Sequence, residues 1–408
     1  MWIPRSACRL SRRDWLKWGA ACLGLRLATG PRSVAAQSAE ALTKRKRDFL
    51  KRFLYSRDDL DACLAGKGFY FSRYDAEVGY VHGDRDFKEG MDGSICSYRY
   101  DRSGARRTIA HADKACRINT YGNSFTSCEQ VSDGETWQEI LAAHLGEPIR
   151  NFGVGGYSVY LAYLRMMREE KRSPAKHIIF NIFDDDHYRN LLCWQRFRFG
   201  VNRKSIAPTT PYVSVNPEAR EMVEHPNPCP KPDALYELCD LDGAFRMFKD
   251  DYLLERYVVR EQRRERKEAK VPANDFEDEE LTRLALYAST RIVEKVEEFA
   301  AREKRVLLYV LSYNPNTIRR RLRDGHRFDQ SFVDFFDRRR LPYVDLLRAH
   351  ADDYARFAPG VEAYVKRYFI GHYNPLGNHF CAFALKDKLA GMLKPPSPAY
   401  SADKASRK

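Results

Sequence analysis

Ser124 is the first residue of the chain whose position suggests chemistry. It lies in the segment Tyr121–Thr126 (YGNSFT), directly after the short segment Cys116–Thr120, which ends in a predicted strand. Open α/β sheets keep their reactive groups at the carboxyl ends of their strands, and Gly122 tolerates the sharp turn that would project the Ser124 hydroxyl there. Taken alone, the tripeptide Gly-Asn-Ser is equally typical of an ordinary turn or a helix cap.

Three further segments follow Ser124 in an order that gives it a chemical context. They are Asn151–Gly156 (NFGVGG), Phe180–Asn190 (FNIFDDDHYRN) and His372–Gly377 (HYNPLG). Together with Ser124 they resemble the SGNH hydrolases, also called GDSL esterases or lipases, in which Ser, Gly, Asn and His from four sequence blocks meet at one site. The resemblance covers residues 116–195 and 303–392, about half of the chain.

This resemblance implies a role for each matched residue. Ser124 would be the nucleophile and His372 the base that it needs, since a free hydroxyl is a poor nucleophile at neutral pH. His372 opens a loop before the last predicted helix, where Pro375 fixes the helix start, and His379 is the weaker candidate. The backbone N–H groups of Ser124 and Gly155 would form the oxyanion hole.

The chain departs from the family pattern before His372. The family usually carries an aspartate two or three residues before the histidine, whereas residues 369–371 read Phe-Ile-Gly. The imidazole Nδ1 is therefore expected to face a backbone carbonyl or a distant acid. The acids in question are Asp345, Asp352 and Asp353.

A second departure concerns the third oxyanion donor, which is normally an asparagine. Asp185 occupies that position, and an ionised aspartate cannot donate a hydrogen bond; Asn181 lies earlier in the predicted strand. The run Asp184–His187 also suggests a metal site, but successive residues at a strand end point in different directions. Capping and ion pairing with Arg189 are therefore the favoured roles, and no metal or cofactor is expected.

The N-terminus resembles a bacterial twin-arginine export signal. The basic segment Ser11–Lys17 (SRRDWLK) precedes the mildly apolar Trp18–Thr29 and the small residues Val34–Ala36. The apolar run is too short to span a bilayer, so we expect cleavage after Ala36, no stable membrane anchor, and a periplasmic or secreted protein. The alternative is a basic amphipathic helix that stays in place.

Composition and charge indicate a folded globule without nucleic acid as a partner. The 408 residues are 44% hydrophobic and 13% aromatic, and the net charge is +14. Residues 1–36 hold seven basic residues and one acidic residue, so their removal would leave +8. The basic stretches Arg256–Lys270 and Arg319–Arg323 are interleaved with acids or helix formers, which is typical of solvated helix faces.

Eight cysteines lie outside the predicted signal, and none forms a CxxC motif. An oxidising compartment permits disulfides, and Cys229–Cys239 is the most local pair. Cys116, Cys193 and Cys381 lie in or beside apolar segments, which favours buried thiols.

The hydrophobic pattern predicts alternating strands and helices. The expected strands are Ile118–Tyr121, Ile149–Phe152, His177–Phe183, Val306–Leu311 and Tyr343–Leu346. The expected helices are Glu135–Leu145, Tyr157–Glu170, Asp278–Lys304, Phe332–Arg339, Ala351–Arg367 and Pro375–Leu393. This alternation predicts a three-layer α/β/α fold with a doubly wound parallel sheet of about five strands, which the resemblance makes flavodoxin-like.

Around this domain, residues 116–393, the sequence predicts three other parts. Residues 37–115 form a helical and β-rich extension that includes a strand, turn and strand over Ser97–Arg107. Residues from about 195 to 275 form an insertion over the active-site face, first a proline-rich loop and then a charged helix. Residues 394–408 form a loose tail.

Two functions from different classes remain open on this basis. The first is an exported SGNH-type serine hydrolase that removes or transfers an acyl group, such as acetyl, on a carbohydrate or other small ester. The second is a non-catalytic protein that keeps the fold and binds a glycan in the cleft. The two departures from the family pattern favour the second.

Overall fold

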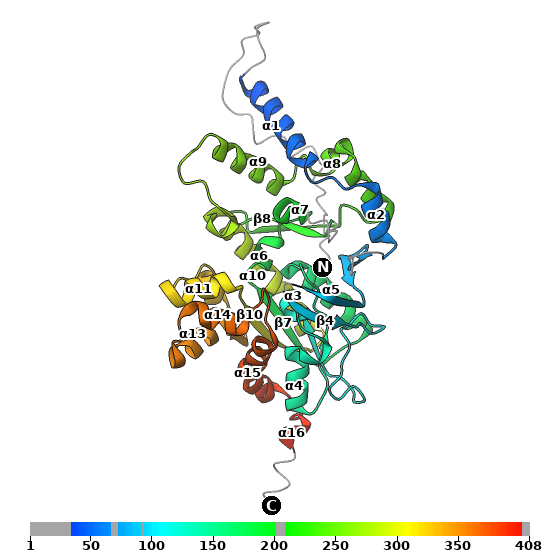
Figure 1. Cartoon of the computed structure of the whole chain (residues 1–408), viewed down its shortest axis with the longest axis vertical. Coiled ribbons are helices and arrows are strands. Elements are labelled where there is room, and N and C mark those ends of the chain that lie inside the picture. Colours follow the sequence, from blue (N-terminus) through cyan, green and yellow to red (C-terminus); the bar gives the residue numbers. More distant parts are fainter. Residues whose placement is uncertain (1–33, 67–71, 92, 201–208, 402–408) are drawn as a thin grey trace, which may run out of the picture. The chain divides into compact units, whose positions relative to one another are not determined.

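The computed structural model of the chain describes residues 34–66, 72–91, 93–200 and 209–401 (Figure 1). The chain divides into two compact units, residues 1–44 and 45–408, and the fold and site below belong to the second. Residues 1–33 of the predicted export signal lie outside the described residues. Among the described helices, none has the length and apolar character needed to cross a membrane.

Five parallel strands form the central sheet. In chain order they are β5 (Ile118–Tyr121), β6 (Arg150–Asn151), β7 (His177–Phe183), β10 (Val306–Ser312) and β11 (Tyr343–Asp345). Their spatial order is β11-β10-β7-β5-β6, which is the flavodoxin-like order 2-1-3-4-5. The strand order reverses between β5 and β7, the place where open parallel sheets bind their ligands. The predicted five-stranded parallel sheet is confirmed.

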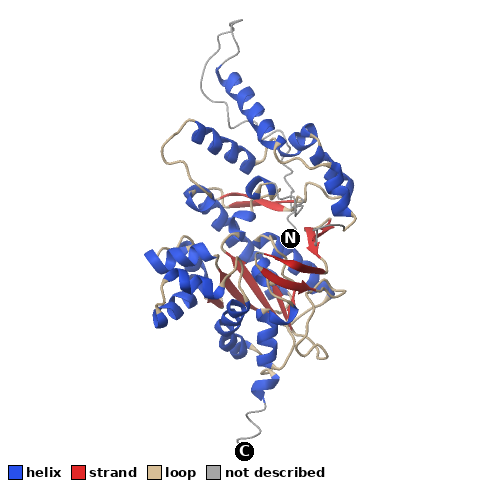
Figure 2. Cartoon of the chain, viewed as in Figure 1, coloured by secondary structure: helices blue, strands red, loops and turns tan. Residues whose placement is uncertain are grey.

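Helices cover this sheet on both faces (Figure 2). On one face α4 (Trp137–Leu145) packs against α15 (Pro375–Met392), and on the other α5 (Val159–Arg172) packs against α10 (Glu279–Arg302). Right-handed crossovers require this, because the connection from β5 to β6 runs opposite to the later connections. All seven residues of β7 are buried, as expected for a strand covered on both sides.

The predicted single helix over residues 351–367 is wrong. Two helices replace it, α13 (Leu346–Phe357) and α14 (Val361–Tyr368). Between them Ala358 and Gly360 have φ values of 40° and 88°. Pro359 causes the break, because proline lacks an N–H and excludes the α conformation from the residue before it.

The insertion is more ordered than a proline-rich loop, so that prediction is also wrong. It contains the antiparallel hairpin of β8 (Tyr212–Asn216) and β9 (Glu221–His225). Pro211, Pro217 and Pro226 flank the two strands or lie in their turn, where a missing N–H breaks no ladder. The rest of the described insertion is helical: α7 (Arg196–Phe199), η3 (Pro232–Cys239), α8 (Leu241–Phe248), α9 (Tyr252–Glu265) and η4 (Asp275–Glu277).

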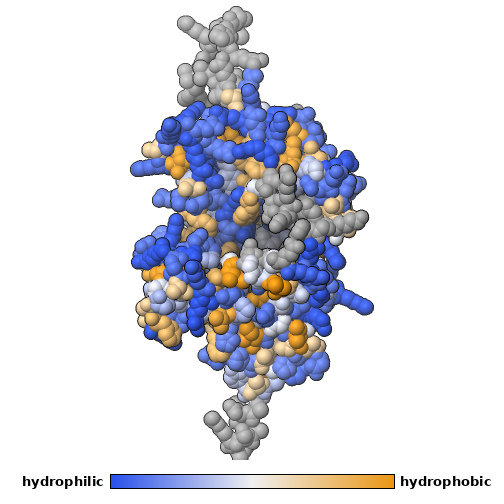
Figure 3. Space-filling model, viewed as in Figure 1, coloured by the Kyte–Doolittle hydropathy of each residue, from blue (hydrophilic) through white to orange (hydrophobic). Residues whose placement is uncertain are grey.

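The basic stretch Arg256–Lys270 coincides largely with α9, and its arginines pair with acids. Arg256 pairs with Asp278, Arg260 with Asp275 and Arg263 with Glu268. Hydrophilic residues cover much of the described surface in the view of Figure 3. The stretch is thus helical as far as Glu265, and these three arginines are paired with acids.

The described residues before the sheet form helices and two hairpins. These are α1 (Val34–Lys51), α2 (Arg57–Leu64) and the hairpins β1–β2 (Ser72–Asp75, Gly79–His82) and β3–β4 (Arg85–Met91, Ser94–Tyr98). The predicted strands over Ser97–Arg107 are wrong beyond β4. A single bridge, between Tyr100 and Arg106, spans the turn, and the Arg106 backbone also forms a bridge with Asn151 of β6.

The remaining helices are short or lie outside the sheet's two layers. They are α3 (Ser124–Ser127), η2 (Asp133–Glu135), α6 (Asp186–Arg189), α11 (Pro315–Asp324), α12 (Gln330–Arg339) and α16 (Pro398–Ser401). The prediction of a loose tail is wrong up to residue 401, since α16 packs against α4 and Ser397 is buried. Residues 402–408 of that tail lie outside the described residues.

All eight cysteines of the described residues are free thiols, so the suggested Cys229–Cys239 disulfide is wrong. The buried Cys229 thiol instead donates to the carbonyl of Ala234 at 3.4 Å and lies 3.9 Å from the Met247 sulfur. Cys193 and Cys381 are buried, and Cys116 is half-buried.

We expect Gly153→Ala to destabilise the protein and Gly391→Ala to leave it unharmed. A Cβ at Gly153 would lie 2.2 Å from the Ser127 nitrogen and 2.6 Å from the Thr126 carbonyl carbon. Both are backbone atoms, which cannot move away as the end of a flexible side chain can. The clash should lower the free energy of unfolding by about 1–3 kcal/mol, which urea unfolding would measure. Gly391 has open space around it in α15, so alanine there should be neutral or stabilising by up to about 1 kcal/mol. Equal stability of the two variants would contradict this packing.

Candidate active site

A turn that is held by close packing and by hydrogen bonds places Ser124 at the carboxyl end of β5. Gly122 has a φ of 152°, and a Cβ there would lie 2.2 Å from the Thr126 hydroxyl oxygen, so only glycine fits. The Asn123 side chain accepts a hydrogen bond from the Phe125 N–H at 2.8 Å and donates one to Asp186 at 2.7 Å. One amide thus caps α3 and fastens the serine turn to the residues that follow β7.

Two backbone donors beside this turn are unused. Among the residues that the structure describes, no acceptor binds the N–H of Ser124 or that of Gly155. The first is an N-terminal helix donor, which has no partner within its own helix. The glycine loop is itself fixed, because Tyr80 donates to the Gly155 carbonyl at 2.7 Å and Gln195 to the Gly156 carbonyl at 2.8 Å. Both groups are free to bind an anion or a developing oxyanion.

His372 lies in the loop between α14 and α15 and packs beside the serine turn. Its N–H donates to the Gln130 side chain at 2.7 Å, and its ring lies 5.0 Å from that of Phe125, centroid to centroid. Within the described part of the chain, no hydrogen bond joins the His372 ring to the Ser124 hydroxyl. Burial, and then the charge of Arg189, lower the pKa of His372 to about 4.

Glu129 is the carboxylate that faces His372, and the sequence analysis missed it. Its Oε2 lies 3.8 Å from Nε2 of His372. Its Oε1 would lie 1.8 Å from a Cβ placed on Gly155, so this carboxylate reaches both His372 and Gly155. Since the imidazole is neutral at neutral pH, the contact becomes an ion pair only when the ring takes up a proton.

The backbone around Glu129 is strained into this position. Cys128 and Gln130, on either side of it, have φ values of 58° and 74°, which cost roughly 1–2 kcal/mol each for residues other than glycine. The buried Arg106 guanidinium holds the strained loop. It donates to the carbonyls of Ser127, Cys128 and Val131 and pairs with Asp133 at 2.8 Å.

The expected partners of the His372 Nδ1 do not bind it. Nδ1 is buried and has no hydrogen-bond partner, so the prediction of a carbonyl or distant acid is wrong. Asp345 caps α13 and pairs with Arg327, Asp352 is exposed beside Arg348, and Asp353 accepts from two tyrosines. The weaker candidate base, His379, stacks on Phe383 with ring centroids 4.5 Å apart.

Asp185 cannot serve as the third oxyanion donor. Its carboxylate pairs with Arg189 at 2.7 Å and with Arg198 at 2.6 Å. Burial favours the neutral acid, but these two guanidinium groups outweigh it and hold the pKa of Asp185 below its usual range. Asn181 is also committed, since it donates to Thr126 at 3.0 Å and accepts from Ser312 at 2.8 Å.

The other two aspartates of this run are structural. Asp184 accepts hydrogen bonds from Asn314 and Thr317, and burial raises its pKa to about 7. Asp186 accepts from Asn123 and pairs with Arg189 at 3.1 Å. The prediction of ion pairing with Arg189 is confirmed for Asp185 and Asp186.

No protein-family model and no curated protein matches this chain. The site joins a serine at a strand end, two unused N–H donors, a neutral histidine and a carboxylate.

We expect His372 to titrate with a pKa of about 4 rather than 6.5, because burial disfavours the imidazolium. The titration can be followed by NMR on protein with labelled histidine rings, with His372→Gln assigning the signal. Between pH 6.5 and 4 the unfolded chain would bind a proton that the folded chain does not. This residue's contribution to stability should therefore fall as the pH drops through that window. A midpoint near 6.5 would contradict the buried setting.

Proposed function

We propose that this protein is an SGNH-type serine hydrolase that cleaves or transfers an acyl group on a carbohydrate or other small ester. One observation carries the proposal: Ser124 follows β5 at the switch point, His372 packs on Phe125 beside it, and the N–H groups of Ser124 and Gly155 have no acceptor among the described residues. Export by the twin-arginine route stays part of the proposal, on the basis of Arg12 and Arg13.

In this mechanism His372 takes the proton of Ser124 as the hydroxyl attacks the ester carbonyl. The Nδ1 atom has no partner, whereas Nε2 faces Glu129, so the tautomer with a proton on Nε2 leaves the Nδ1 lone pair for the serine. Glu129 then stabilises the imidazolium as it forms, the task of the orienting acid in serine hydrolases. Glu129 would thus replace the aspartate that is missing before His372.

The negative charge develops on the former carbonyl oxygen. The N–H groups of Ser124 and Gly155 would bind this oxygen, and the Arg189 charge that lowers the His372 pKa also favours it. As the tetrahedral intermediate collapses, the bond from carbon to the leaving alcohol breaks and that alcohol takes the proton from His372. Water or a second alcohol then attacks the acyl-serine, with His372 again as the base.

A glycan-binding protein is the second candidate, and two observations favour it. His372 forms no hydrogen bond with the Ser124 hydroxyl, and Asp185 offers no third donor. Catalytic hydrogen bonds are often long in the absence of substrate, and for this reason we rank the hydrolase first.

We expect a fluorophosphonate probe to label the protein on Ser124, because the probe reacts only with an activated serine. Intact mass and peptide mapping would locate the adduct. Ser124→Ala should abolish labelling, whereas Ser127→Ala, a buried serine one turn away, should retain it. Labelling that survives in Ser124→Ala, or that never occurs in the folded wild type, would favour the glycan-binding candidate.

We expect Glu129→Gln to slow labelling by about 10²–10⁴, the range for a base that loses its supporting acid. Asp353→Asn is the matched control, since Asp353 bonds two tyrosines and does not contact His372. Melting temperatures would show whether both variants fold. A pH profile adds a second readout, because the loss of Glu129 should lower the apparent pKa of the base. Equal losses in the two variants would count against Glu129.

A further inference from the structure

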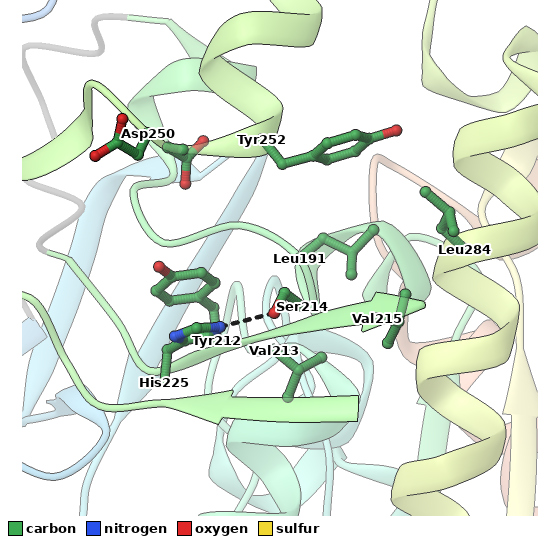
Figure 4. Close-up of a pocket in the computed structure, with 10 residues that line it drawn as sticks. Leu191, Tyr212, Val213, Ser214, Val215, His225, Asp250, Tyr252 and Leu284 are labelled. Carbon is green, nitrogen blue, oxygen red and sulfur yellow. Dashed lines mark hydrogen bonds between the residues drawn. The ribbon is translucent and has the colours of Figure 1, made fainter. Parts of the chain in front are cut away.

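A cavity lies at the start of α9, and its lining includes none of the residues of the serine turn. Its volume is about 240 Å³, which is below the range of roughly 300–1,000 Å³ of pockets for drug-sized ligands. The hairpin strand β8 forms one wall, and the residues before α9 form the opposite wall (Figure 4). Leu284 of α10 closes one end. The cavity is thus built from the insertion and from α10.

One part of the lining is apolar. Leu191 and Leu284 contribute aliphatic side chains, whereas the side chains of Val213 and Val215 lie on the other side of β8 from Asp250 and Tyr252 (Figure 4). Val213 is almost fully buried, and its N–H donates to the Asn190 carbonyl at 2.8 Å, which anchors the hairpin to the segment after β7. This part would accept the apolar body of a ligand.

Aromatic rings and a carboxylate line the other part. The Tyr212 ring stacks on the His225 ring with centroids 4.5 Å apart, and a hydrogen bond of 2.8 Å between His225 and Ser214 holds the stack (Figure 4). Tyr252 projects along the opposite wall. Asp250 precedes it and makes no hydrogen bond or ion pair within the described residues. The faces of tyrosine rings attract cations.

The charge of the lining selects the sign of a ligand. The chain carries +14, yet among the described residues the lining holds no lysine or arginine and has two carboxylates, those of Asp250 and Asp251. Asp251 is already committed, since it accepts hydrogen bonds from the Leu254 N–H and the Cys193 thiol. Asp250 is therefore the available counter-charge.

Two cationic groups that contact residues at the start of α9 or directly before it are paired with acids. Arg256 donates to the Tyr252 hydroxyl at 2.9 Å but pairs with Asp278 and Glu280. Lys46, which donates to the Lys249 carbonyl, pairs with Glu255 at 2.7 Å. Neither group opposes a bound cation with an uncompensated charge.

We propose that this cavity binds a small organic ammonium ion with an apolar body. The aliphatic part takes the body, the Tyr212 and Tyr252 rings face the ammonium group, and Asp250 supplies the counter-charge. An anion would face two carboxylates, and a neutral sugar would leave hydroxyl groups against Leu191 and Leu284 without hydrogen bonds. This site is independent of the proposed hydrolase activity.

Three probes of one shape test the proposal by calorimetry at physiological salt: benzylamine, which is cationic, benzyl alcohol, which is neutral, and benzoate, which is anionic. Benzylamine should bind about ten-fold more tightly than benzyl alcohol, and benzoate should not bind. Equal affinity for benzylamine and benzyl alcohol would contradict the proposal, because it would mean that the cavity binds the apolar ring and does not recognise the ammonium group. Preference for benzoate, or binding of none of the three, would overturn the proposal.

Variants locate the bound probe. Asp250→Asn and Tyr252→Leu should each weaken benzylamine binding about ten-fold, whereas Tyr252→Phe, which keeps the ring face, should retain most of it. Asp324→Asn is the matched control, an exposed carboxylate on α11 outside the cavity. Ser124→Ala should bind benzylamine like the wild type, so a failure of the hydrolase proposal would leave this result unchanged. Loss of binding in the Asp324 control, or none in Asp250→Asn, would reject the assignment.

Discussion

The buried guanidinium of Arg106 is the interaction on which the candidate active site depends. It gathers the carbonyls of Ser127, Cys128 and Val131 and the carboxylate of Asp133 around one charge. A buried arginine is costly to desolvate, and removing one partner of such a pair typically costs about 3–5 kcal/mol. Here the charge is fully partnered, and it holds a loop whose backbone would otherwise relax. Glu129 faces His372 because this loop cannot open.

The extension that precedes the sheet, which includes Arg106, also supports the candidate active site. The Tyr98 hydroxyl oxygen, from β4, accepts a hydrogen bond from the Gln130 N–H at 2.8 Å, and the Tyr80 hydroxyl, from β2, donates one to the Gly155 carbonyl. Tyr157 in turn donates to the Tyr80 carbonyl. The hairpins therefore support both the serine loop and the glycine loop from outside, and the sheet alone does not define the site.

Much of the fold and part of the site could be predicted from the sequence. Buried parallel strands are continuous apolar runs, so β7 and β10 could be recognised, and Ser124 was expected at the end of a strand; Gly155 and His372 were assigned to the same site only by the family resemblance. Glu129 could not be found this way. Its place depends on left-handed backbone at Cys128 and Gln130, residues with no such preference, and on a contact with Arg106 that no local pattern encodes. The hairpin β8–β9 was not predicted because the prolines that flank its strands or lie in its turn favour a loop in the sequence pattern.

The free thiols affect how this protein would be inactivated over time. Cys128, Cys193 and Cys381 are buried, and burial raises the pKa of each thiol, so the reactive thiolate is scarce in the folded state. These three buried thiols are thus protected from oxidation while the protein is folded. The unfolded chain is not, because the same sulfurs become exposed and can cross-link in any pairing. In an oxidising medium, unfolding would therefore be a one-way event, and the lifetime of the protein would be set by its unfolding rate rather than by its equilibrium stability.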